Sequence, residues 1–476
     1  MITTSIEMTG LDSQTVALTG RDLDELEANL TEPVLRPGDE GWDEATLLWN
    51  AMVSRTPALV VQPASADEVS AAVAFAREHA VLISVKGGGH NIAGTAIAEG
   101  GLLLDMSRPR YVNVEPDARL AHVGPGCLLR DVDAATQRHG LATTLGFVSE
   151  TGVAGLTLGG GFGYLARRFG WAVDNLEEVE IVTADGAICT ANRHDHSDLF
   201  WAVRGGGGNF GVVTRFTFRL HEVGPTVTGG LLIWSARDAD TVLPMYLQLV
   251  QSAPRELTAA LIIRLAPPAP FIPVEGHYKP IIAMLVCHSG ENAAADLAQA
   301  RATGALLADL VTQRPYVEQQ SFLDAMEPKG LNQYWKAEYL SSLSLEYLDT
   351  FLDCALGQSS PHSISVVFPI SGATNERADD DGAIGNRDAR FISGFSGTWA
   401  PDDPRDDEHI AWVRGSWERI RPFGTGGNYV NFHVTDDDES LTAAAYGANY
   451  RRLQQIKATY DPGNLFRTNR NILPRA

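Results

Sequence analysis

Three glycine-rich stretches, one of which contains a histidine, are the parts of this chain whose residue types and spacing best suit chemistry. They are GGGHNIAG at 87–94, GVAGLTLGGGFG at 152–163 and GGGGNFG at 205–211. Glycine permits positive φ angles and lets backbone N–H groups approach a ligand closely, which a pyrophosphate requires. One such stretch is typical of an ordinary turn, whereas three in the first half of the chain indicate a shared cradle for a phosphate-bearing ligand.

The third stretch formally contains the dinucleotide-binding pattern GxGxxG, from Gly206 to Gly211. That pattern binds a pyrophosphate only between a strand and a helix, because the helix N-terminus holds the anion. Here the residues that follow, VVTRFTFRL at 212–220, alternate β-branched and aromatic types as a strand does. The sequence therefore argues against a nicotinamide-dependent dehydrogenase.

The elements that must position these stretches are mixed strands and helices over the first 224 residues. Residues 58–63 favour a strand, and residues 65–80 favour an amphipathic helix that begins near Ser65. Residues 81–85 favour a strand that leads directly into Gly87.

The segment 225–427 has a different pattern, which predicts an antiparallel sheet with helices lying on it. The expected strands are 228–236, 257–266 and 280–290, and the expected helices are 296–310, 345–356 and 406–423. Residues 373–388 are rich in Asp, Asn, Gly and Arg and are expected to form an exposed loop. The last segment is expected to contain a strand at 428–434 and a helix at 446–460.

The composition excludes several classes of partner. The 37 basic and 59 acidic residues give a net charge of −22, and the sequence has no basic run that would bind a phosphate backbone. The four cysteines form no CxxC pair, so we expect reduced thiols and no metal site. The first residues lack a signal-peptide pattern, and no apolar run approaches the roughly 20 residues that span a bilayer. We therefore expect a soluble cytoplasmic protein that binds neither nucleic acid nor membrane.

With these features in place, residues 57–224 resemble the FAD-binding domain of the vanillyl-alcohol-oxidase superfamily. The nearest likeness is to the berberine-bridge-enzyme-like FAD-linked oxidoreductases, close to bacterial 6-hydroxynicotine-oxidase-type members. The segments that carry the resemblance are SVKGGGHNIAG, GVAGLTLGGGFGYLARRFGWAVDN, SDLFWAVRGGGGNFGVVT and the terminal YDPGNLFRTNRNI, in the family's order.

The resemblance implies an α+β fold with a two-lobed FAD-binding domain and an α+β substrate domain that contains an antiparallel sheet. The FAD-binding domain would span 1–224, with its core at 57–224, and the substrate-binding domain would span 225–427. A C-terminal segment, 428–476, would return to the FAD domain.

The resemblance also implies which residues hold the FAD. His90 occupies the position at which the family attaches the 8α-methyl group of the flavin, so one covalent histidyl link is expected. Such a link should raise the reduction potential of the flavin by withdrawing electrons, and it should prevent loss of the cofactor. The other expected cofactor-binding residues are Gly87, Gly88, Gly89, Asn91, Gly155, Gly160, Gly161, Gly163, Asp174, Asn175, Val213, Asn431, Asn469 and Asn471.

Two positions near the second glycine-rich stretch bear on the chemistry. Many relatives carry a second link through a cysteine four residues before Gly152, and this chain has Val148 there. The residue just before that glycine tends to control the access of oxygen to the flavin, and here it is Thr151. A small β-branched residue at this place accompanies oxidase behaviour in the family, so we expect oxygen to be the electron acceptor.

Two tyrosines that the family associates with proton abstraction are replaced by Phe162 and Phe432. Phenylalanine can neither accept nor donate a proton, so a mechanism that needs tyrosinate at either position is closed. In a strand at 428–434, Val430 and Phe432 would share one face, which makes the flavin-facing side apolar. Either the substrate needs little deprotonation, as with an amine, or another side chain is the base. The candidate bases are Lys336, which stands among aromatic residues, followed by Tyr334, Tyr339 and Arg387.

These observations leave three functions open. The leading one is an oxidase that transfers hydride from a small organic substrate (amine, phenol, alcohol or sugar) to flavin N5, with oxygen giving hydrogen peroxide. The first alternative is a flavin dehydrogenase with a quinone or protein acceptor, and the second is a flavin-binding protein whose catalysis has decayed. A homodimer is the default expectation for the oligomeric state. The substrate is not specified, because the segment 225–427 matches the family most loosely.

Overall fold

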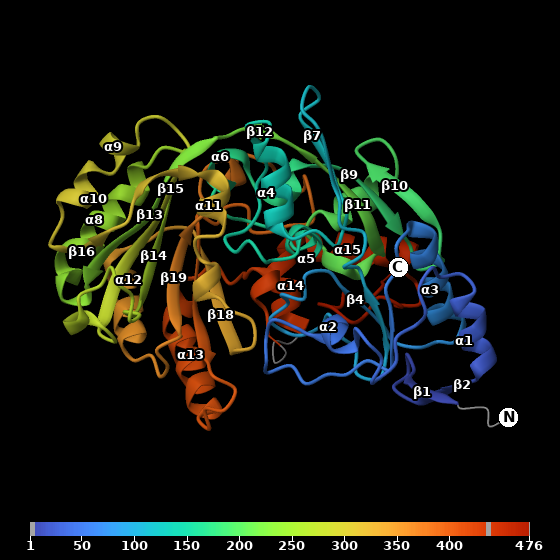
Figure 1. The fold of residues 1–476 in the computed structure, drawn as a ribbon. Helices are drawn as coiled ribbons and strands as arrows, with labels where there is room; N and C mark the ends of the chain where they lie inside the picture. Colours follow the sequence, from blue (N-terminus) through green and yellow to red (C-terminus); the bar gives the residue numbers. More distant parts are fainter. Residues whose placement is uncertain (1–4, 435–438, 476) are drawn as a thin grey trace.

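The computed structural model describes residues 5–434 and 439–475, which fold into two lobes lying side by side (Figure 1). The first lobe holds the N-terminal half of the chain, coloured blue to green, together with the last segment, coloured red. The second lobe holds the residues between β13 (Thr226–Ser235) and α13 (Asp406–Ile420). The chain thus ends in the lobe where it began, and the mixture of helices and antiparallel sheets confirms the predicted α+β class.

The first lobe is built on two sheets; the first glycine-rich stretch follows a strand of one, the third precedes a strand of the other, and the second contains helix α5 (Val153–Leu158). A parallel sheet has the order β3 (Leu59–Val61), β5 (Leu102–Asp105), β4 (Ile83–Lys86). An antiparallel sheet has the order β10 (Ile188–Asn192), β9 (Leu176–Val182), β11 (Val212–Arg219), β7 (Leu120–Val123), β6 (Val112–Glu115). Small pairs are formed by β1 (Ile6–Thr9) with β2 (Thr15–Leu18), and by β8 (Leu141–Ala142) with β12 (His221–Glu222). Since β11 is a strand, the rejection of a dinucleotide fingerprint at 206–211 is confirmed.

Helices cover these sheets. They are α1 (Gly20–Glu27), α2 (Trp42–Thr46), α3 (Ala66–Glu78), α4 (Leu129–Gln137), α5 (Val153–Leu158), α6 (Ala166–Phe169), α7 (Ser197–Val203), α14 (Glu439–Tyr446) and α15 (Tyr450–Tyr460). Helix α3 begins where the sequence predicts, because the hydroxyl of Ser65 accepts a hydrogen bond from the backbone N–H of Glu68. Its buried residues Val69, Val73 and Ala76 recur at helical spacing and pack into the lobe core.

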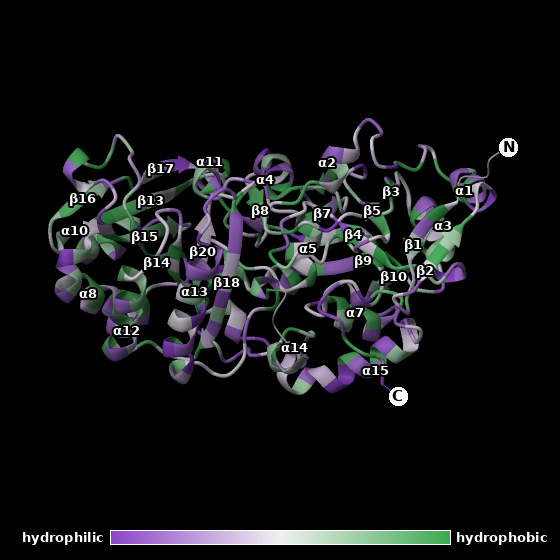
Figure 2. Cartoon of the chain, turned by 90° about the horizontal axis from the view of Figure 1, so that it is seen from below, coloured by the Kyte–Doolittle hydropathy of each residue, from purple (hydrophilic) through white to green (hydrophobic). Residues whose placement is uncertain are grey.

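The second lobe is one antiparallel sheet of eight strands among the described residues. Its order is β16 (Leu306–Asp309), β13, β15 (Pro280–His288), β14 (Leu257–Leu265), β19 (Ile364–Pro369), β20 (Phe391–Trp399), β18 (Asn332–Leu340), and β17 (Thr312–Pro315) also pairs with β13. Helices α8 (Ala239–Ser252), α12 (Leu345–Leu356) and α13 pack on one face through a shared apolar core (Figure 2). The short helices are α9 (Ala293–Asp296), α10 (Ala298–Ala302) and α11 (Tyr316–Gln320).

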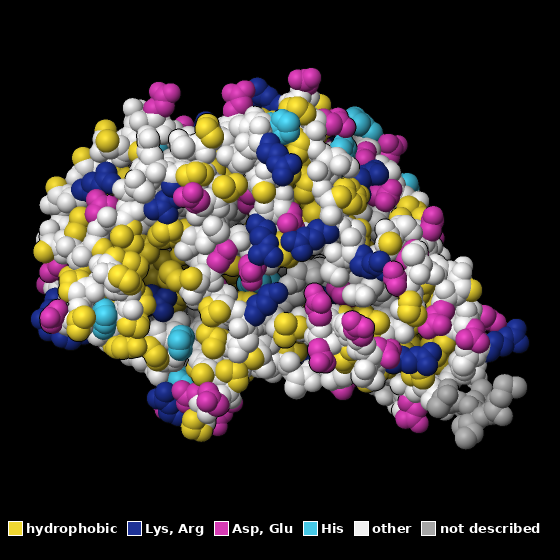
Figure 3. Space-filling model, in the orientation of Figure 1, with side chains coloured by type: hydrophobic (Ala, Val, Ile, Leu, Met, Phe, Trp, Pro, Cys, Tyr) yellow, Lys and Arg dark blue, Asp and Glu magenta, His cyan; other side chains and the backbone are white. Residues whose placement is uncertain are grey.

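The surface is mixed in charge. In the view of Figure 3, acidic side chains are scattered over both lobes, and a small group of Lys and Arg lies near the centre. The left part of this face is hollowed and lined with hydrophobic side chains over the strands of the second lobe. Within the described ranges, no group of His, Cys, Asp and Glu could hold a metal ion, and no helix is long and apolar enough to cross a bilayer.

Two predicted elements are wrong, and a third is only partly right. The helix expected at 296–310 ends at Ala302, because Gly304 takes a φ of +60° and the chain then pairs with β13 as β16. The strand expected at 428–434 is a 3-10 turn, Val430–Phe432, so strand alternation does not describe its faces. The segment 373–388 is a loop as expected, but it is only partly exposed: Thr374, Ala383 and Arg387 are at most 4% exposed, whereas residues 378–380 are exposed.

Candidate functional site

A cavity of about 360 Å³ lies where the two lobes meet, and residues of all three glycine-rich stretches line it. Its volume falls within the roughly 300–1,000 Å³ typical of pockets that bind small molecules and cofactors. The second lobe contributes Leu323, Glu327, Trp335 and Phe368 to the wall. The arrangement brings together residues that are hundreds of positions apart in the sequence.

The first and second glycine-rich stretches touch each other backbone to backbone. A Cβ atom placed on Gly88 would lie 2.5 Å from the backbone nitrogen of Gly152, and a Cβ on Gly152 would overlap the backbone of Gly88 in the same way. Gly89, next in the loop, has a φ of +68°. Glycine is therefore required here both for close approach and for backbone conformation.

His90 follows this contact and lies at the cavity wall. Its ring stacks on the indole of Trp49, with centroids 4.4 Å apart and planes inclined by 18°. The Nε2 atom of His90 is buried and has no hydrogen-bond partner among the described residues. Burial, reinforced by the positive charge of Lys329, lowers the pKa of His90 to about 4, so the imidazole is neutral at neutral pH.

Trp49 is itself held in place from two sides. Its backbone N–H donates to the carbonyl of Gly89 at 2.9 Å, and its indole Nε1–H donates to the carbonyl of Glu327 at 3.1 Å. The imidazole of His90 is therefore fixed by a side chain that bridges the first and second lobes.

The C-terminal tail contributes to the cavity wall beside the third glycine-rich stretch. Asn469 lines the cavity and donates to the carbonyls of Gly208 and Phe466 at 3.2 and 3.1 Å. Its Oδ1 atom is buried without a partner among the described residues, as is Oδ1 of Asn471. A ligand that donates hydrogen bonds at this end would satisfy the Asn469 acceptor.

Nine of the residues predicted to bind the cofactor line this cavity. They are Gly87, Gly88, Gly89, His90, Asn91, Gly155, Val213, Asn431 and Asn469, and Val148 and Thr151 line it as well. The others, Gly160, Gly161, Gly163, Asp174, Asn175 and Asn471, are not among the lining residues. The glycine cradle fits the phosphates of FAD, and the apolar aromatic wall fits its flat ring system. Two buried atoms that have no partner in the described part of the chain, His90 Nε2 and Asn469 Oδ1, fit the polar edge of the ring.

Replacing Gly88 with alanine is expected to lower the FAD content of the purified protein at least about fivefold, because the two backbones must separate, which typically costs about 1–3 kcal/mol. The ratio of flavin absorbance to protein absorbance measures the FAD content. Gly415→Ala, on α13, is the control, since a Cβ there meets nothing within 4 Å. Full FAD content in Gly88→Ala would contradict the assignment of this contact to the cofactor site.

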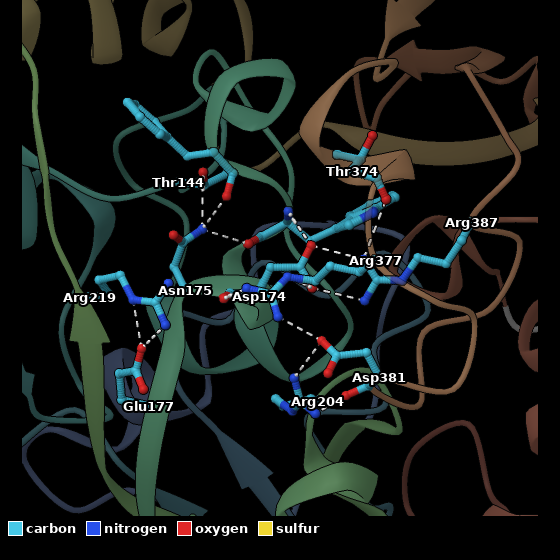
Figure 4. Close-up of polar contacts among 12 residues, drawn as sticks. Thr144, Asp174, Asn175, Glu177, Arg204, Arg219, Thr374, Arg377, Asp381 and Arg387 are labelled. Carbon is cyan, nitrogen blue, oxygen red and sulfur yellow. Dashed lines mark hydrogen bonds and ion pairs between the residues drawn. The ribbon is translucent and has the colours of Figure 1, made fainter. Parts of the chain in front are cut away.

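The carboxylate of Asp174 is the centre of a buried ion-pair network (Figure 4). Arg387 donates hydrogen bonds of 2.8 Å to each of its two oxygens, and Arg377 lies 3.7 Å from Oδ1. Arg377 and Arg204 also pair with Asp381. Since Arg377, Asp381 and Arg387 belong to the segment 373–388, this network ties that segment to the first lobe and buries Arg387.

The same network supports the second glycine-rich stretch from behind. Asp174 belongs to a 3-10 turn, Ala172–Asn175, whose backbone N–H groups donate to the carbonyls of Gly160 and Gly161 at 3.1 and 2.7 Å. Asn175 lies 2.6 Å from His221 through its Oδ1 atom. Asp174 and Asn175 therefore brace the cofactor loop, and nothing in their placement indicates direct contact with a ligand in the cavity.

The predicted base Lys336 lies on the wrong face of its strand for the cavity. Side chains alternate along β18, and Trp335 points to the cavity. The hydroxyl of Tyr334 accepts a hydrogen bond of 2.8 Å from Arg414 of α13, and the ammonium of Lys336 lies 5.4 Å from the ring of Trp417 on the same helix. Both side chains thus face the covering helices, and Lys336 lines a separate, much smaller cavity.

The remaining candidate bases do not line the cavity either. Arg387 is engaged by Asp174, and Tyr339 is buried in a hydrophobic cluster behind the wall. Tyr429 does line the cavity, but its hydroxyl accepts hydrogen bonds from Gly161 and Asn431, both 3.0 Å. Burial raises the pKa of Tyr429 to about 12, so this phenol keeps its proton.

The wall around the cavity is largely aromatic. Phe162 and Phe432, the two positions where tyrosine is replaced, both line it. Phe162 packs edge-to-face on Phe368 at 5.3 Å, and Phe432 lies 5.0 Å from Trp335. The apolar character expected from the two phenylalanines is present, although it arises from a turn and not from one face of a strand.

Sequence reasoning missed several titratable residues that line the cavity, including Tyr446 and Arg470, and the acidic one is Glu327. Its Oε2 atom is buried and unpartnered among the described residues, and burial raises its pKa to about 7 against the opposing effect of Arg264. Glu327 stands in a short loop, AMEPKG, that belongs to no motif and no resemblance. Only the approach of the second lobe to Trp49 places it at the cavity.

Known proteins agree with this geometry. A family model described as "FAD binding domain" matches residues 57–192, and one described as "Berberine and berberine like" matches residues 428–473. A FAD-linked oxidoreductase of Dictyostelium discoideum is 30% identical over 447 residues, which cover 93% of this chain and 94% of that protein. The (R)-6-hydroxynicotine oxidase of Paenarthrobacter nicotinovorans is 27% identical over 463 residues, which cover 93% of this chain and 96% of that protein.

The solved structure of berberine bridge enzyme from Eschscholzia californica superposes with a TM-score of 0.85 at 20% identity, over 96% of this chain and 99% of that one. This likeness shows the fold. The 30% identity to a FAD-linked oxidoreductase over nearly the full length of both chains, together with the two family models, shows that the chain belongs to the berberine-bridge-enzyme-like family of FAD-linked oxidoreductases.

Proposed function

We propose that the protein is an oxidase that holds FAD through one covalent bond to His90 and takes hydride from a small organic substrate. The observation that carries the proposal is the imidazole of His90, which presents a buried, unpartnered Nε2 at the cavity wall. Because the ring is neutral, one of its nitrogens offers a lone pair for bond formation. Val148 stands where a second link would need a thiol, so we expect one bond.

FAD, when bound, supplies the acceptor for a hydride from a substrate C–H bond and passes two electrons to oxygen, which becomes hydrogen peroxide. The chain's own part is to position the substrate and to keep water away from it. Trp335, Phe368 and Phe432 form an apolar wall that suits both tasks. Neither Phe162 nor Phe432 can move a proton, so any proton of the substrate must go to another group.

Two observations favour oxygen as the acceptor. Thr151 lines the cavity, and its small side chain leaves room beside the second glycine-rich stretch. The relative from Paenarthrobacter nicotinovorans is named an oxidase.

The test of the proposal is a screen of amines, phenols, alcohols and sugars for substrate-dependent oxygen consumption with matching hydrogen peroxide. An oxidase consumes oxygen and forms peroxide in equal amounts without an added acceptor. If turnover instead requires a quinone dye, the protein is a dehydrogenase. If no compound bleaches the flavin under anaerobic conditions, the protein binds flavin without catalysis.

Replacing Thr151 with leucine is expected to slow reoxidation of the reduced enzyme by oxygen roughly tenfold, because the longer side chain fills the space that oxygen would use. Anaerobic reduction by substrate should change by less than about twofold, since the substrate wall is untouched. Stopped-flow absorbance measures both steps. Thr151→Val, of nearly the same shape, is the control, and equal reoxidation rates in all three proteins would remove Thr151 from the oxygen path.

A further inference from the structure

Glu327 is held over the cavity by a loop that is fastened at both ends. On one side, the carboxylate of Asp324 accepts hydrogen bonds from the backbone and hydroxyl of Ser149, at 2.8 and 2.6 Å. On the other side, the carbonyl of Glu327 accepts from the indole of Trp49, and Gly330 donates to the carbonyl of Trp49 at 3.1 Å. Glu327 lies between these anchors, so its position at the wall is imposed by the loop.

The carboxyl of Glu327 lacks the partner that a buried charge requires. Its Oε2 atom is buried without a hydrogen bond among the described residues. Arg264 is the nearby cation that lowers the Glu327 pKa, but its guanidinium donates to the carbonyls of Leu265 and Pro361, both at 3.2 Å. Of the other titratable residues that line the cavity, His90 is neutral at neutral pH, and Tyr429 and Tyr446 keep their protons because burial raises the pKa of each phenol. Arg470 donates a hydrogen bond to the carbonyl of Val434. A buried carboxylate in this condition costs several kcal/mol unless a ligand supplies a cation or a donor.

The surroundings of this carboxyl suit a cation. Trp49 and Trp335 line the same cavity with ring centroids 6.4 Å apart and planes inclined by 71°, and Phe432 adjoins Trp335. One face of Trp49 is covered by the ring of His90, so Trp335 is the more open of the two indoles. Indole faces attract ammonium groups, most strongly where water is excluded. An aromatic wall with one carboxyl is a composition that suits an organic ammonium ion.

We propose that the substrate of this site is an organic amine that binds as its ammonium ion, with the carboxylate of Glu327 as counter-ion and proton acceptor. This inference rests on the proposed function and names its substrate class. In the first step the N–H bond breaks, its proton forms an O–H bond with Glu327, and the electron pair stays on nitrogen. The neutral amine then loses hydride from the adjacent carbon to the bound FAD and becomes an iminium ion, while the proton passes from Glu327 to water.

The proton transfer is favoured by the place in which it occurs. In an apolar cavity a neutral amine and a neutral carboxylic acid are less penalised than a separated ion pair. Burial raises the pKa of Glu327 to about 7, which brings this carboxyl closer to the pKa of an alkylamine than an exposed glutamate would be. Phe162 and Phe432 are compatible with this route, because it needs no tyrosinate.

The inference is tested with the flavin-loaded enzyme and two probes of the same shape, benzylamine and benzyl alcohol. Their dissociation constants are measured anaerobically from the change in the visible flavin spectrum, or from the concentration dependence of flavin reduction where it occurs. Wild type is expected to bind benzylamine at least about tenfold more tightly than benzyl alcohol. Glu327→Gln should abolish this preference and leave the affinity for benzyl alcohol within about twofold.

Glu338→Gln is the matched control. Glu338 is also a buried carboxyl whose pKa is raised to about 7, but it accepts a hydrogen bond from Trp417 at 2.8 Å on the helix face of β18. An amide keeps that acceptor, so this variant should retain the preference for benzylamine.

The pH dependence gives a second readout. Benzylamine stays protonated below about pH 9, so its affinity for wild type should rise as pH increases through about 7, where the Glu327 carboxylate forms, and should be flat in Glu327→Gln. Equal affinity for amine and alcohol in wild type overturns the inference but leaves the oxidase proposal standing. A Glu327→Gln protein that loses its flavin while wild type and Glu338→Gln retain theirs shows that the carboxyl serves the cofactor, which also overturns it.

Discussion

Replacing His90 with alanine is expected to leave the protein without covalently bound flavin. When wild type is precipitated with acid, the yellow colour should stay in the pellet, whereas from His90→Ala it should pass entirely into the supernatant. The reason is that the buried, neutral imidazole is the group at the cavity wall with an unpartnered nitrogen able to form the bond. Peptide mass mapping of wild type should find flavin on one peptide, the one that contains His90.

The same variant should also turn over at least about tenfold more slowly, because loss of the electron-withdrawing link lowers the driving force for hydride transfer. The control is His221→Ala. The His221 ring also has a pKa lowered to about 4 by burial and stacks on Phe169 with centroids 4.0 Å apart, but it does not line the cavity. Covalent flavin retained in His90→Ala, or lost equally in His221→Ala, would contradict the attachment at His90.

Replacing Arg387 with methionine is expected to be the most destabilising of the changes considered, at about 3–5 kcal/mol, because it leaves the Asp174 carboxylate buried without its bidentate partner. Thermal unfolding followed by circular dichroism measures the fall in melting temperature. FAD content should fall as well, since the turn that contains Asp174 holds the carbonyls of Gly160 and Gly161.

Adding Asp174→Asn to Arg387→Met should restore part of the lost stability, because no uncompensated charge then remains. Arg405→Met is the matched control: Arg405 also pairs with a carboxylate through two nitrogens, that of Asp403, but it is exposed, so its loss should hardly change the melting temperature. A double variant less stable than Arg387→Met would mean that the stabilising contacts of Asp174 are those with Trp171 and Arg377 and not the pair with Arg387.

Local signals predicted those parts of the molecule in which neighbours in the sequence act together. The strand–loop order VLISVKGGGHN, the cap of α3 at Ser65 and the strand after GGGGNFG depend on residue type and spacing over a few positions, and the structure has all three. The glycine-rich stretches can be recognised for the same reason, because a backbone that approaches a phosphate closely requires glycines at neighbouring positions.

The face of the sheet to which a side chain points depends on the register of its strand. That register is set by pairing with strands that are distant in the sequence. The aromatic neighbours of Lys336 in the sequence favour it as a base, yet those neighbours belong to both faces of β18, and a shift of one residue exchanges the faces. Pairing of β18 with β20 and the docking of α13 turned Lys336 away from the cavity and Trp335 toward it.

Local composition mispredicts the burial of a charged residue when its ion-pair partner lies far away in the chain. Residues 373–388 have the composition of a solvated loop, but Arg387 meets Asp174 from the other lobe, 213 positions earlier, and the pair is buried. Glu327 gave no signal at all, because its role at the cavity comes from the contact of its loop with Trp49, 278 positions away. Residue types and short spacings thus determined the cofactor cradle and its histidine, while the tertiary structure alone decided which polar groups share the cavity, since burial and pairing arise between segments that the sequence does not place side by side.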